Sequence, residues 1–531
     1  MELFKQTGPE LSESYSHDPY LPALIKRWAS EASFPEMAQQ LQHMGDIATR
    51  ELYPLQLNDR LNEPLLTQYS PWGERIDQID VSPLWHRAAV IAAETGLVGI
   101  PYEGNYKEQD RLLQFALVYL FTPSSDIYSC PLAMTDGAAR TLVNSGNQAL
   151  IERALPRLSS RDPQKAWTSG QWMTELTGGS DVGLTETIAR FEDGQWRLYG
   201  RKWFTSATTA NMTLTLARPE GNGPGGKGLA LFYVEPRDEN GKLQNIEVMR
   251  LKDKLGTRKV PTAELLLKGV PAQLVLGTDQ GVRNIAPMLN ITRTWNSISA
   301  IALMRRGLSL AWSYARQRYA FGDYLINKPL HRETLLQLEA EFAGAFYLTF
   351  EMVQLLGHTE QHPDDQQAQA VLRFLTPIVK LTTAKQSVAV LSEVLESFGG
   401  AGYVEDTGLP LLFRDAQVLP IWEGTTNVLS LESLRGLGKS SEAVFEYLLN
   451  WTAGNNSPSS LQAIDALKQA AQWLVQTQSE PIQLEAGARR FALKVGRALE
   501  VLAIQRQLNH SLPQNDLAED LSQLQARLFF I

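Results

Sequence analysis

The sequence predicts a multidomain α+β protein with a helical N-terminal region, a central β-domain, a C-terminal four-helix bundle and a helical appendage. Two observations lead to this fold class. Short apolar runs separated by turn residues fill one block of the chain, and long runs with apolar residues three and four apart fill the rest. Strands gathered in one block and helices in others are typical of α+β proteins. The predicted domains are 1–165, 166–278, 279–440 and 441–531.

The N-terminal region contains helical periodicity but no cluster of titratable side chains. Helices are expected at Leu21–Ala32, at Met37–Leu52 and repeatedly between Pro83 and Leu158. We interpret these segments as packing elements.

The β-domain opens with a strong hairpin signal. Thr187–Tyr199 contains two strand-like runs joined at Asp193-Gly194. Because no long helical pattern intervenes before the next domain, we expect a closed barrel or a sandwich. Further strands are predicted at Met212–Leu216, Leu229–Val234, Ile246–Arg250, Ala263–Leu267 and Ala272–Leu276.

Long amphipathic helices follow the β-domain. Apolar residues from Ile301 to Tyr319 recur at helical spacing, and this pattern, with three later ones, predicts an antiparallel four-helix bundle. The later bundle helices are expected at Thr334–Leu356, Ala368–Phe398 and Asn427–Leu437. After a polar linker, Ala453–Ser459, the appendage is expected to contain helices Leu461–Gln476, Leu484–Asn509 and Leu517–Phe529.

Composition excludes several classes of protein. The net charge of −9 argues against a chain that binds nucleic acid or anionic membranes over its whole surface. The single cysteine, Cys130, cannot form an intrachain disulfide, which fits a reducing compartment. The N-terminus lacks a signal-peptide pattern, and the strongest apolar run, Leu113–Phe121, is shorter than the roughly 20 residues that span a bilayer. We expect a soluble, cytoplasmic protein.

One stretch carries unusual chemistry. Glu423 is a carboxylate flanked by Ile421, Trp422 and a glycine, an apolar setting that would raise its pKa and make it a usable base. Thr425 or Thr426 is expected to cap the helix that follows. A buried structural carboxylate is the alternative interpretation of Glu423.

Two other patterns suggest a phosphate-binding loop and a zinc site, but neither pattern is complete. Gly221–Gly228 resembles part of a phosphate-binding loop, but Gly228 stands where Ser or Thr is needed and a strand follows. His358 and His362 have zinc-helix spacing, but Pro363 ends the helix and no third ligand is evident. We predict no metal.

Six short motifs follow one another along the chain. They are Thr174-Glu-x-x-Gly-Gly-Ser-Asp181, Lys202–Ser206, Lys254–Arg258, Arg318–Gly322, Phe398–Tyr403 and Trp422–Thr425. Together they resemble the acyl-CoA dehydrogenase family, in the family's order and at fitting intervals over about residues 80 to 437. The form of the first motif, the long N-terminal segment and the appendage look most like the alkylation-response, AidB-like branch.

The resemblance implies a β-barrel, FAD bound between barrel and bundle, and a homo-oligomer, expected to be a tetramer. It implies that Met173 and Thr174 hold the flavin ring edge, that Trp203 lies against the ring, and that Thr205 or Ser206 contacts it near N5. Arg318 and Phe321 would reach the FAD of a neighbouring subunit. Further FAD contacts implied are Gly179, Ser180, Phe204, Gly399, Gly400, Trp422, Thr425 and Asn427.

The same resemblance implies that Glu423 is the catalytic base and that an acyl-CoA thioester is the substrate. Substrate contacts are implied for Ser180, Asn290, Arg293 and Gly424. The sequence departs from the family at several positions, which affects the substrate pocket more than the FAD contacts. These departures are Leu176 for Pro, Gln171 for an aromatic residue, Glu396 for Gln and Asn290 for Asp.

Three functions compete on the sequence alone. The first is a flavin acyl-CoA dehydrogenase that passes electrons to an electron-transfer protein, and the second is an oxidase that uses oxygen. The third is a FAD-containing AidB-like protein that binds nucleic acid or has a protective role, with little turnover. The appendage from residue 436 has eight basic and nine acidic residues, yet Arg490, Lys494 and Arg497 share one helix face beside Arg489. We interpret this face as solvated rather than DNA-binding.

Overall fold

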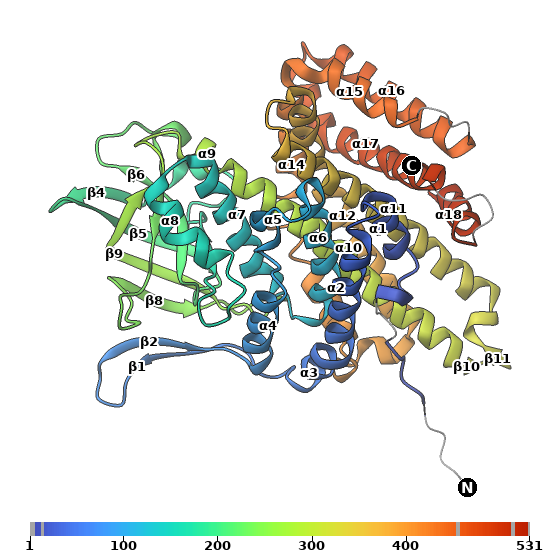
Figure 1. The fold of residues 1–531 in the computed structure, drawn as a ribbon, viewed down its shortest axis with the longest axis horizontal. Helices are drawn as coiled ribbons and strands as arrows, with labels where there is room; N and C mark the ends of the chain where they lie inside the picture. Colours follow the sequence, from blue (N-terminus) through green and yellow to red (C-terminus); the bar gives the residue numbers. More distant parts are fainter. Residues whose placement is uncertain (1–5, 12–14, 453–456, 511–515, 529–531) are drawn as a thin grey trace, which may run out of the picture. The chain divides into compact units, whose positions relative to one another are not determined.

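The computed structural model describes residues 6–11, 15–452, 457–510 and 516–528 (Figure 1). The chain forms two compact units. One combines residues 1–57, 104–124 and 296–531, and the other combines residues 58–103 and 125–295. The predicted N-terminal helical domain, residues 1–165, therefore contributes to both units.

The β-domain is a closed barrel, which decides between the two predicted architectures. Strands β6, β4, β5, β9 and β7 pair in that order, and β7 pairs again with β6, so the ring closes. β3 lies parallel to β6, and β8 pairs with β9. The strands are β3 (Ser169–Trp172), β4 (Ile188–Glu192), β5 (Gln195–Ser206), β6 (Met212–Pro219), β7 (Ala230–Val234), β8 (Ile246–Leu251) and β9 (Thr262–Leu274).

Alternate residues of these strands fill the barrel, as the period-two pattern requires. Leu198, Phe232, Val248 and Leu265 are buried together in this core. The two strands predicted at 263–267 and 272–276 are one strand, β9, so that prediction was wrong. The chain continues through Gly269 at φ +90°, where a Cβ would lie 2.9 Å from the Tyr199 hydroxyl.

The barrel unit also contains a hairpin that was not predicted. β1 (Leu65–Tyr69) and β2 (Arg75–Asp80) pair antiparallel. Their sequences are largely polar and offer no apolar run to signal a strand. The helices of this unit are α4 (Pro83–Glu94), α5 (Ile100–Glu103), α7 (Ser129–Ser145), α8 (Gln148–Leu158) and α9 (Gly281–Asn284).

The four-helix bundle is confirmed. Its helices are α10 (Ala286–Gln317), α11 (Pro329–Gln361), α12 (Gln366–Ser397) and α14 (Thr426–Leu437), and α10 continues across the boundary between the units. Tyr319, predicted inside the first of them, lies instead in the short strand β10 (Tyr319–Ala320), which pairs with β11 (Asp323–Tyr324). The other helices of the unit before the appendage are α1 (Leu21–Trp28), α2 (Phe34–Ile47), α3 (Tyr53–Asn58), α6 (Asp110–Phe121) and α13 (Leu409–Ala416).

The appendage belongs to the bundle unit. Its helices are α15 (Ser441–Leu449), α16 (Pro458–Thr477), α17 (Pro481–His510) and α18 (Asp516–Arg527), and α17 packs against α11, α12, α14 and α16. Because α16 begins at Pro458, the polar linker ends earlier than predicted; residues 453–456 of that linker and Phe529 lie outside the described residues. Among the described residues, no helix is long and apolar enough to cross a membrane.

Candidate active site

The candidate flavin-ring loop, residues 173–187 of the barrel unit, is anchored by a buried ion pair. Lys202 Nζ on β5 lies 2.7 Å from Glu175 Oε1, and both side chains are almost completely buried. Lys202 also donates to the Leu216 carbonyl, and burial lowers its pKa. Glu175 accepts from the main-chain N–H of Glu186 and from the Thr187 hydroxyl. This pair fixes the loop to the barrel wall. Sequence analysis included both residues in motifs but gave them no role.

The same loop turns back so that Thr174 lies beside Trp203. The main-chain N–H of Trp203 donates to the Thr174 carbonyl over 2.9 Å, and Gly178 adopts φ +115° in the turn. A Cβ on Gly179 would lie 2.6 Å from Thr174 Oγ1, so only glycine fits there. The structure therefore brings together three residues that were predicted to form one half of the cofactor site.

At the end of β5, successive side chains differ in their exposure to solvent. Trp203 is half-buried and Phe204 is exposed, and Lys252 Nζ lies 3.3 Å from the Trp203 ring centroid. Thr205 is buried and donates to the Ala263 carbonyl, whereas the half-buried Ser206 lies 3.1 Å from Thr262 Oγ1. Of the two hydroxyls proposed for the flavin, that of Ser206 is the more accessible.

The Lys254–Arg258 motif forms a tight loop behind Ser206. Lys254 Nζ donates to the carbonyls of Thr257 and Val260 and to Thr262 Oγ1, the last over 3.0 Å. Thr257 adopts φ +50° in this loop. Lys254, Thr262 and Ser206 thus form a hydrogen-bonded chain that leads to the end of β5.

Among the remaining predicted residues of this unit, Met173 and Asn290 are half-buried, Ser180 is exposed and Arg293 is buried in α10. Gln171, which stands where the family has an aromatic residue, has a buried Oε1 that accepts no hydrogen bond from any described residue. A buried acceptor of this kind is a fit for a polar ligand edge.

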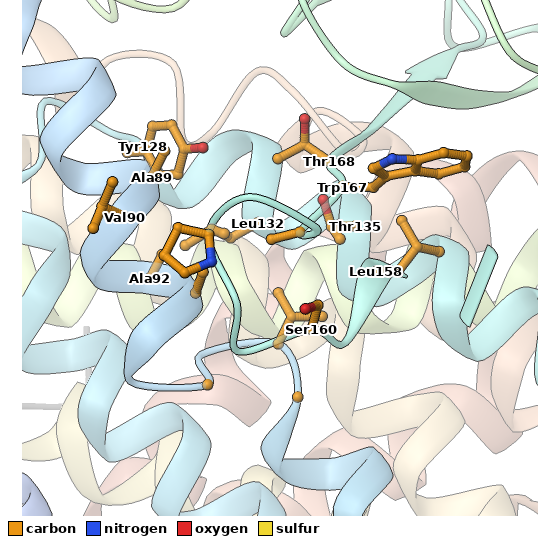
Figure 2. A pocket seen from close by; sticks show the side chains of 16 residues that line it. Ala89, Val90, Ala92, Tyr128, Leu132, Thr135, Leu158, Ser160, Trp167 and Thr168 are labelled. Carbon is orange, nitrogen blue, oxygen red and sulfur yellow. The ribbon is translucent and has the colours of Figure 1, made fainter. Parts of the chain in front are cut away.

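A separate pocket of the barrel unit is too small for a nucleotide cofactor. Its volume is about 90 Å³, whereas ligand pockets usually measure about 300–1,000 Å³. Figure 2 shows its lining, which is mostly apolar and interrupted by the hydroxyls of Tyr128, Thr135, Ser160 and Thr168. None of the predicted site residues lines this pocket.

The predicted base lies in the bundle unit on a strained loop before α14. Glu423 is half-buried and adopts φ +56°, which is uncommon for a residue other than glycine. The buried Lys380 of α12 donates to the carbonyls on both sides of it, Trp422 O and Gly424 O, each over 2.7 Å. The Trp422 indole N–H donates to Asn296 Oδ1. Two hydrogen bonds therefore hold the backbone on either side of Glu423, and a third holds the neighbouring Trp422 side chain.

The helix that follows begins as predicted. Thr425 is the N-cap of α14, and its side chain accepts from the Val428 N–H. Thr425 and Asn427 are exposed at this helix N-terminus, where a helix dipole favours phosphate. The Asn427 Oδ1 accepts from Arg489 of the appendage over 3.1 Å.

The Gly399–Gly400 turn and the β10–β11 hairpin are both open to solvent. A Cβ added to Gly399 or Gly400 would meet no atom within 4 Å, and Gly399 adopts φ +60°. Phe321, at the hairpin tip, is 93% exposed with φ +53°, and Lys328 donates to its carbonyl. Arg318 is half-buried at the base of the hairpin.

The basic face of α17 is engaged within the protein. Arg497 donates to Glu341 of α11 over 2.7 Å and lies 3.0 Å from Glu500, and Lys494 donates to Gln469 of α16. Arg490 is exposed. The four cations therefore do not form a uniform surface for phosphates.

Comparison with known proteins identifies the family. Residues 9–164 match the adaptive response protein AidB N-terminal domain, residues 170–270 the acyl-CoA dehydrogenase middle domain, and residues 279–437 the acyl-CoA dehydrogenase C-terminal domain. Acyl-CoA dehydrogenase family member 11 of Caenorhabditis elegans is 43% identical, over 93% of this chain and 84% of the relative. The chain belongs to the acyl-CoA dehydrogenase family.

One further relative and two solved structures are similar to most of this chain. Putative acyl-CoA dehydrogenase AidB of Escherichia coli is 31% identical over 83% of this chain and 81% of its own length. The solved structure of Caenorhabditis elegans ACDH-11 in complex with C11-CoA has a TM-score of 0.94 at 40% identity, covering 99% of this chain and 92% of that one. Bd2924 in its apo form has a TM-score of 0.90 at 44% identity, covering 95% and 100%.

These findings confirm the predicted AidB-like branch of the acyl-CoA dehydrogenases. The chain is an oxidoreductase of the acyl-CoA dehydrogenase type, and FAD is its cofactor, as in the rest of the family.

Proposed function

We propose that the protein removes hydrogen from Cα and Cβ of an acyl-CoA thioester, with Glu423 as the base for the α-proton. The observation that carries this proposal is the Glu423 loop. A left-handed backbone at a non-glycine residue is strained, and such strain persists only where the surroundings impose it. Lys380, buried in α12, imposes it by binding the carbonyls on both sides.

Two features of the barrel unit fit a flavin. The buried Gln171 Oε1 accepts no hydrogen bond from a described residue, and a Cβ at Gly179 would lie 2.6 Å from Thr174 Oγ1, so a side chain there would displace the hydroxyl proposed to hold the ring edge. The residues that would hold the ring are on the loop and on the end of β5, and those for the phosphates are at the start of α14. We assign to this cofactor Met173, Thr174, Gly179, Ser180, Trp203, Phe204, Thr205, Ser206, Gly399, Gly400, Trp422, Thr425 and Asn427.

In the proposed reaction Glu423 takes the α-proton at a carboxylate oxygen. Bound FAD supplies the acceptor for the β-hydride, which no side chain provides. Lys380 has a positioning role, because it fixes the backbone from which the carboxylate extends. Filling the site with substrate removes water from around the carboxylate and raises its basicity.

The substrate class is an acyl-CoA. Support comes from the complex of Caenorhabditis elegans ACDH-11 with C11-CoA, a relative that matches 99% of this chain. The polar residues proposed to contact this substrate are Ser180, Asn290, Arg293 and the main chain of Gly424.

We also propose a homo-oligomer, a tetramer by resemblance. Phe321 is 93% exposed, and the exposed Tyr319, Tyr324 and Leu330 lie on the same hairpin and the adjacent helix start. An exposed apolar group of this kind fits a subunit contact. There Arg318 and Phe321 would complete the FAD site of a neighbouring copy, and an electron-transfer protein would receive the electrons.

The deciding experiment is anaerobic single-turnover flavin reduction by an acyl-CoA panel, normalised to bound FAD. We expect Glu423→Gln to retain fold, FAD and ligand binding but to lose about 10²–10⁴-fold in rate, because the amide accepts no proton. Glu423→Asp should retain part of the activity, since the carboxylate is displaced by one methylene. Equal rates in wild type and Glu423→Gln would remove Glu423 from the mechanism.

A further inference from the structure

A carboxylate and two imidazoles meet at the end of α11, and none of the three is among the residues assigned to the flavin or the substrate. His362 Nε2 lies 2.6 Å from Glu108 Oε1, and His358 Nδ1 lies 3.7 Å from the same oxygen. One ligand atom from each of the three residues lies within 4.8 Å of the others. The sequence showed no third ligand for the histidine pair, and Glu108, about 250 residues away in the chain, now provides one.

The backbone around this cluster is held firmly. Glu108 belongs to a short helical turn, residues Lys107–Gln109, that packs directly on α11. A Cβ on Gly357 would lie only 2.2 Å from the Glu108 carbonyl oxygen, so the glycine permits the close approach. Next to it the buried Arg111 donates to both oxygens of Glu360, over 2.9 and 2.8 Å. The position of Glu108 beside the histidines is therefore built into the fold.

A fourth residue orients one of the imidazoles. His358 Nε2 lies 3.1 Å from Asp365 Oδ2, while Asp365 Oδ1 caps α12 by accepting from the Ala368 N–H. If Nε2 donates its proton to Asp365, Nδ1 turns a lone pair towards the Glu108 carboxylate. Two facing lone pairs repel each other, and a metal ion bound between Nδ1 and the carboxylate removes this repulsion by accepting both lone pairs.

We propose that Glu108, His358 and His362 bind a divalent transition-metal ion, represented by Zn²⁺, with Asp365 as the outer carboxylate that orients His358. Two histidines and one carboxylate are a known zinc ligand set, and imidazole ligands disfavour Mg²⁺ and Ca²⁺. A histidine that gives its other N–H to a carboxylate is a recurring feature of zinc sites. Water would complete the coordination.

The geometry requires small side-chain movements only. Tetrahedral zinc with bonds of about 2.1 Å separates its ligand atoms by about 3.4 Å. The Glu108–His358 distance of 3.7 Å is already close to that value, and the Glu108–His362 pair opens slightly as the ion replaces the proton between them. All three side chains are between 35% and 52% exposed, so an ion reaches them from solvent. The bound ion would fasten the Lys107–Gln109 turn to the end of α11.

The test is calorimetric titration of the FAD-loaded protein with Zn²⁺ near pH 7.5, with retained zinc counted after dialysis. We expect one Zn²⁺ per chain, and at least tenfold weaker binding in Glu108→Gln, His358→Gln and His362→Gln. Asp365→Asn should preserve the helix cap and weaken binding by about 10–100-fold. His43→Gln, at an exposed helical histidine outside the cluster, is the matched control and should bind as wild type.

Two further measurements sharpen the result. Mg²⁺ and Ca²⁺ should not compete with Zn²⁺, because imidazole ligands disfavour both of these ions. Zinc should also raise the melting temperature of wild type and not that of His358→Gln/His362→Gln. No binding by wild type, or equal binding by wild type and this double variant, would overturn the proposal.

Discussion

Two buried lysines, Lys202 in the barrel unit and Lys380 in the bundle unit, support the two halves of the candidate site in different ways. Lys202 contacts a buried carboxylate, Glu175, as well as a carbonyl. Lys380 donates to two main-chain carbonyls that flank the proposed base. The first lysine fixes the path of a loop, and the second fixes a strained conformation of the backbone.

Because the two lysines have different partners, replacing each one should have a different effect on stability and on catalysis. Removing one member of a buried ion pair leaves an uncompensated charge, which is among the most destabilising changes a protein undergoes. Removing a buried donor from two carbonyls leaves two neutral acceptors without a hydrogen bond. This lowers the free energy of unfolding by less than an uncompensated buried charge does. The barrel half should therefore lose stability first, and the bundle half should lose catalysis first.

The largest effect on stability is expected for Lys202→Met. It leaves Glu175 buried without its cation and should lower the free energy of unfolding by about 3–5 kcal/mol. Urea unfolding of the FAD-loaded protein measures this effect, and FAD retention should fall with it because the 173–187 loop is released. Lys165→Met is the matched control, since that lysine is 77% exposed in a surface pair and should change stability by less than about 0.5 kcal/mol.

A double variant makes this prediction sharper. Adding Glu175→Gln to Lys202→Met removes the orphaned charge, so part of the lost stability should return. If Lys202→Met alone is as stable as wild type, the ion pair does not anchor the loop.

The next effect concerns Lys380→Met. Freed carbonyls should cost about 1–3 kcal/mol of stability, and the Glu423 loop should relax from its left-handed conformation. We expect anaerobic flavin reduction per bound FAD to fall at least tenfold while FAD content stays near that of wild type. Lys385→Met, at an exposed position of the same helix, should leave the rate unchanged. An unchanged rate in Lys380→Met would show that Lys380 supports the fold but does not position the base.

Sequence reasoning proposed most residues of the candidate site because the motifs that contain them are local. Thr174, Trp203, Glu423 and the Thr425 cap all lie in short, distinctive stretches, and the helix and strand periodicities predicted most elements around them. Lys380 was missed because its function depends on carbonyls some forty residues away. A lysine between Val379 and Leu381, on the apolar side of a helix, was the one local sign that it is buried.

The partners of Glu108 and Arg497 could not be predicted either, because they are distant from these residues in the sequence. Nothing near Glu108 suggests the histidines that it meets, and nothing near Arg497 suggests Glu341. Barrel closure was also undecided, because the pairing of β7 with both β6 and β9 is a property of the assembled sheet.

A third buried titratable side chain is an acid, and burial favours its neutral, protonated form. Glu500 of α17 is completely buried beside Arg497, and burial raises its pKa to about 8, although the arginine opposes the shift. The folded protein thus holds the Glu500 proton more tightly than the unfolded chain, whose glutamate pKa is near 4.5. Its contribution to stability is complete below pH 4.5 and is lost as the pH rises to about 8.

We therefore expect Glu500→Gln to be more stable than wild type at pH 9, by about 1–3 kcal/mol, and to show a flatter pH dependence between pH 5 and 8. Urea midpoints across this pH range measure the difference. Glu519→Gln, at an exposed position of α18, is the control. A wild-type stability that rises with pH over this range, relative to Glu500→Gln, would contradict the assignment.

The smallest effect is expected for DNA binding by the basic row on α17. Unlike the two buried lysines, these cations lie near the surface, yet Arg489, Lys494 and Arg497 already donate to Asn427, Gln469 and Glu341. Binding DNA would require these contacts to be exchanged for phosphates. We expect wild type to bind duplex DNA no more tightly than a non-specific protein, with a Kd of about 10⁻⁴–10⁻⁶ M at physiological salt.

A salt titration of duplex binding gives the measurement. Each phosphate contact contributes about −0.9 to the slope of log K against log salt, so a row of several contacts would be visible at once. Arg490→Gln should change neither affinity nor slope, because a single exposed cation on a chain of net charge −9 is a weak anchor. A sub-micromolar, salt-sensitive complex that Lys494→Gln weakens would mean that the row exchanges its internal partners for phosphates, and the AidB-like branch would then include DNA binding in this chain as well as acyl-CoA chemistry.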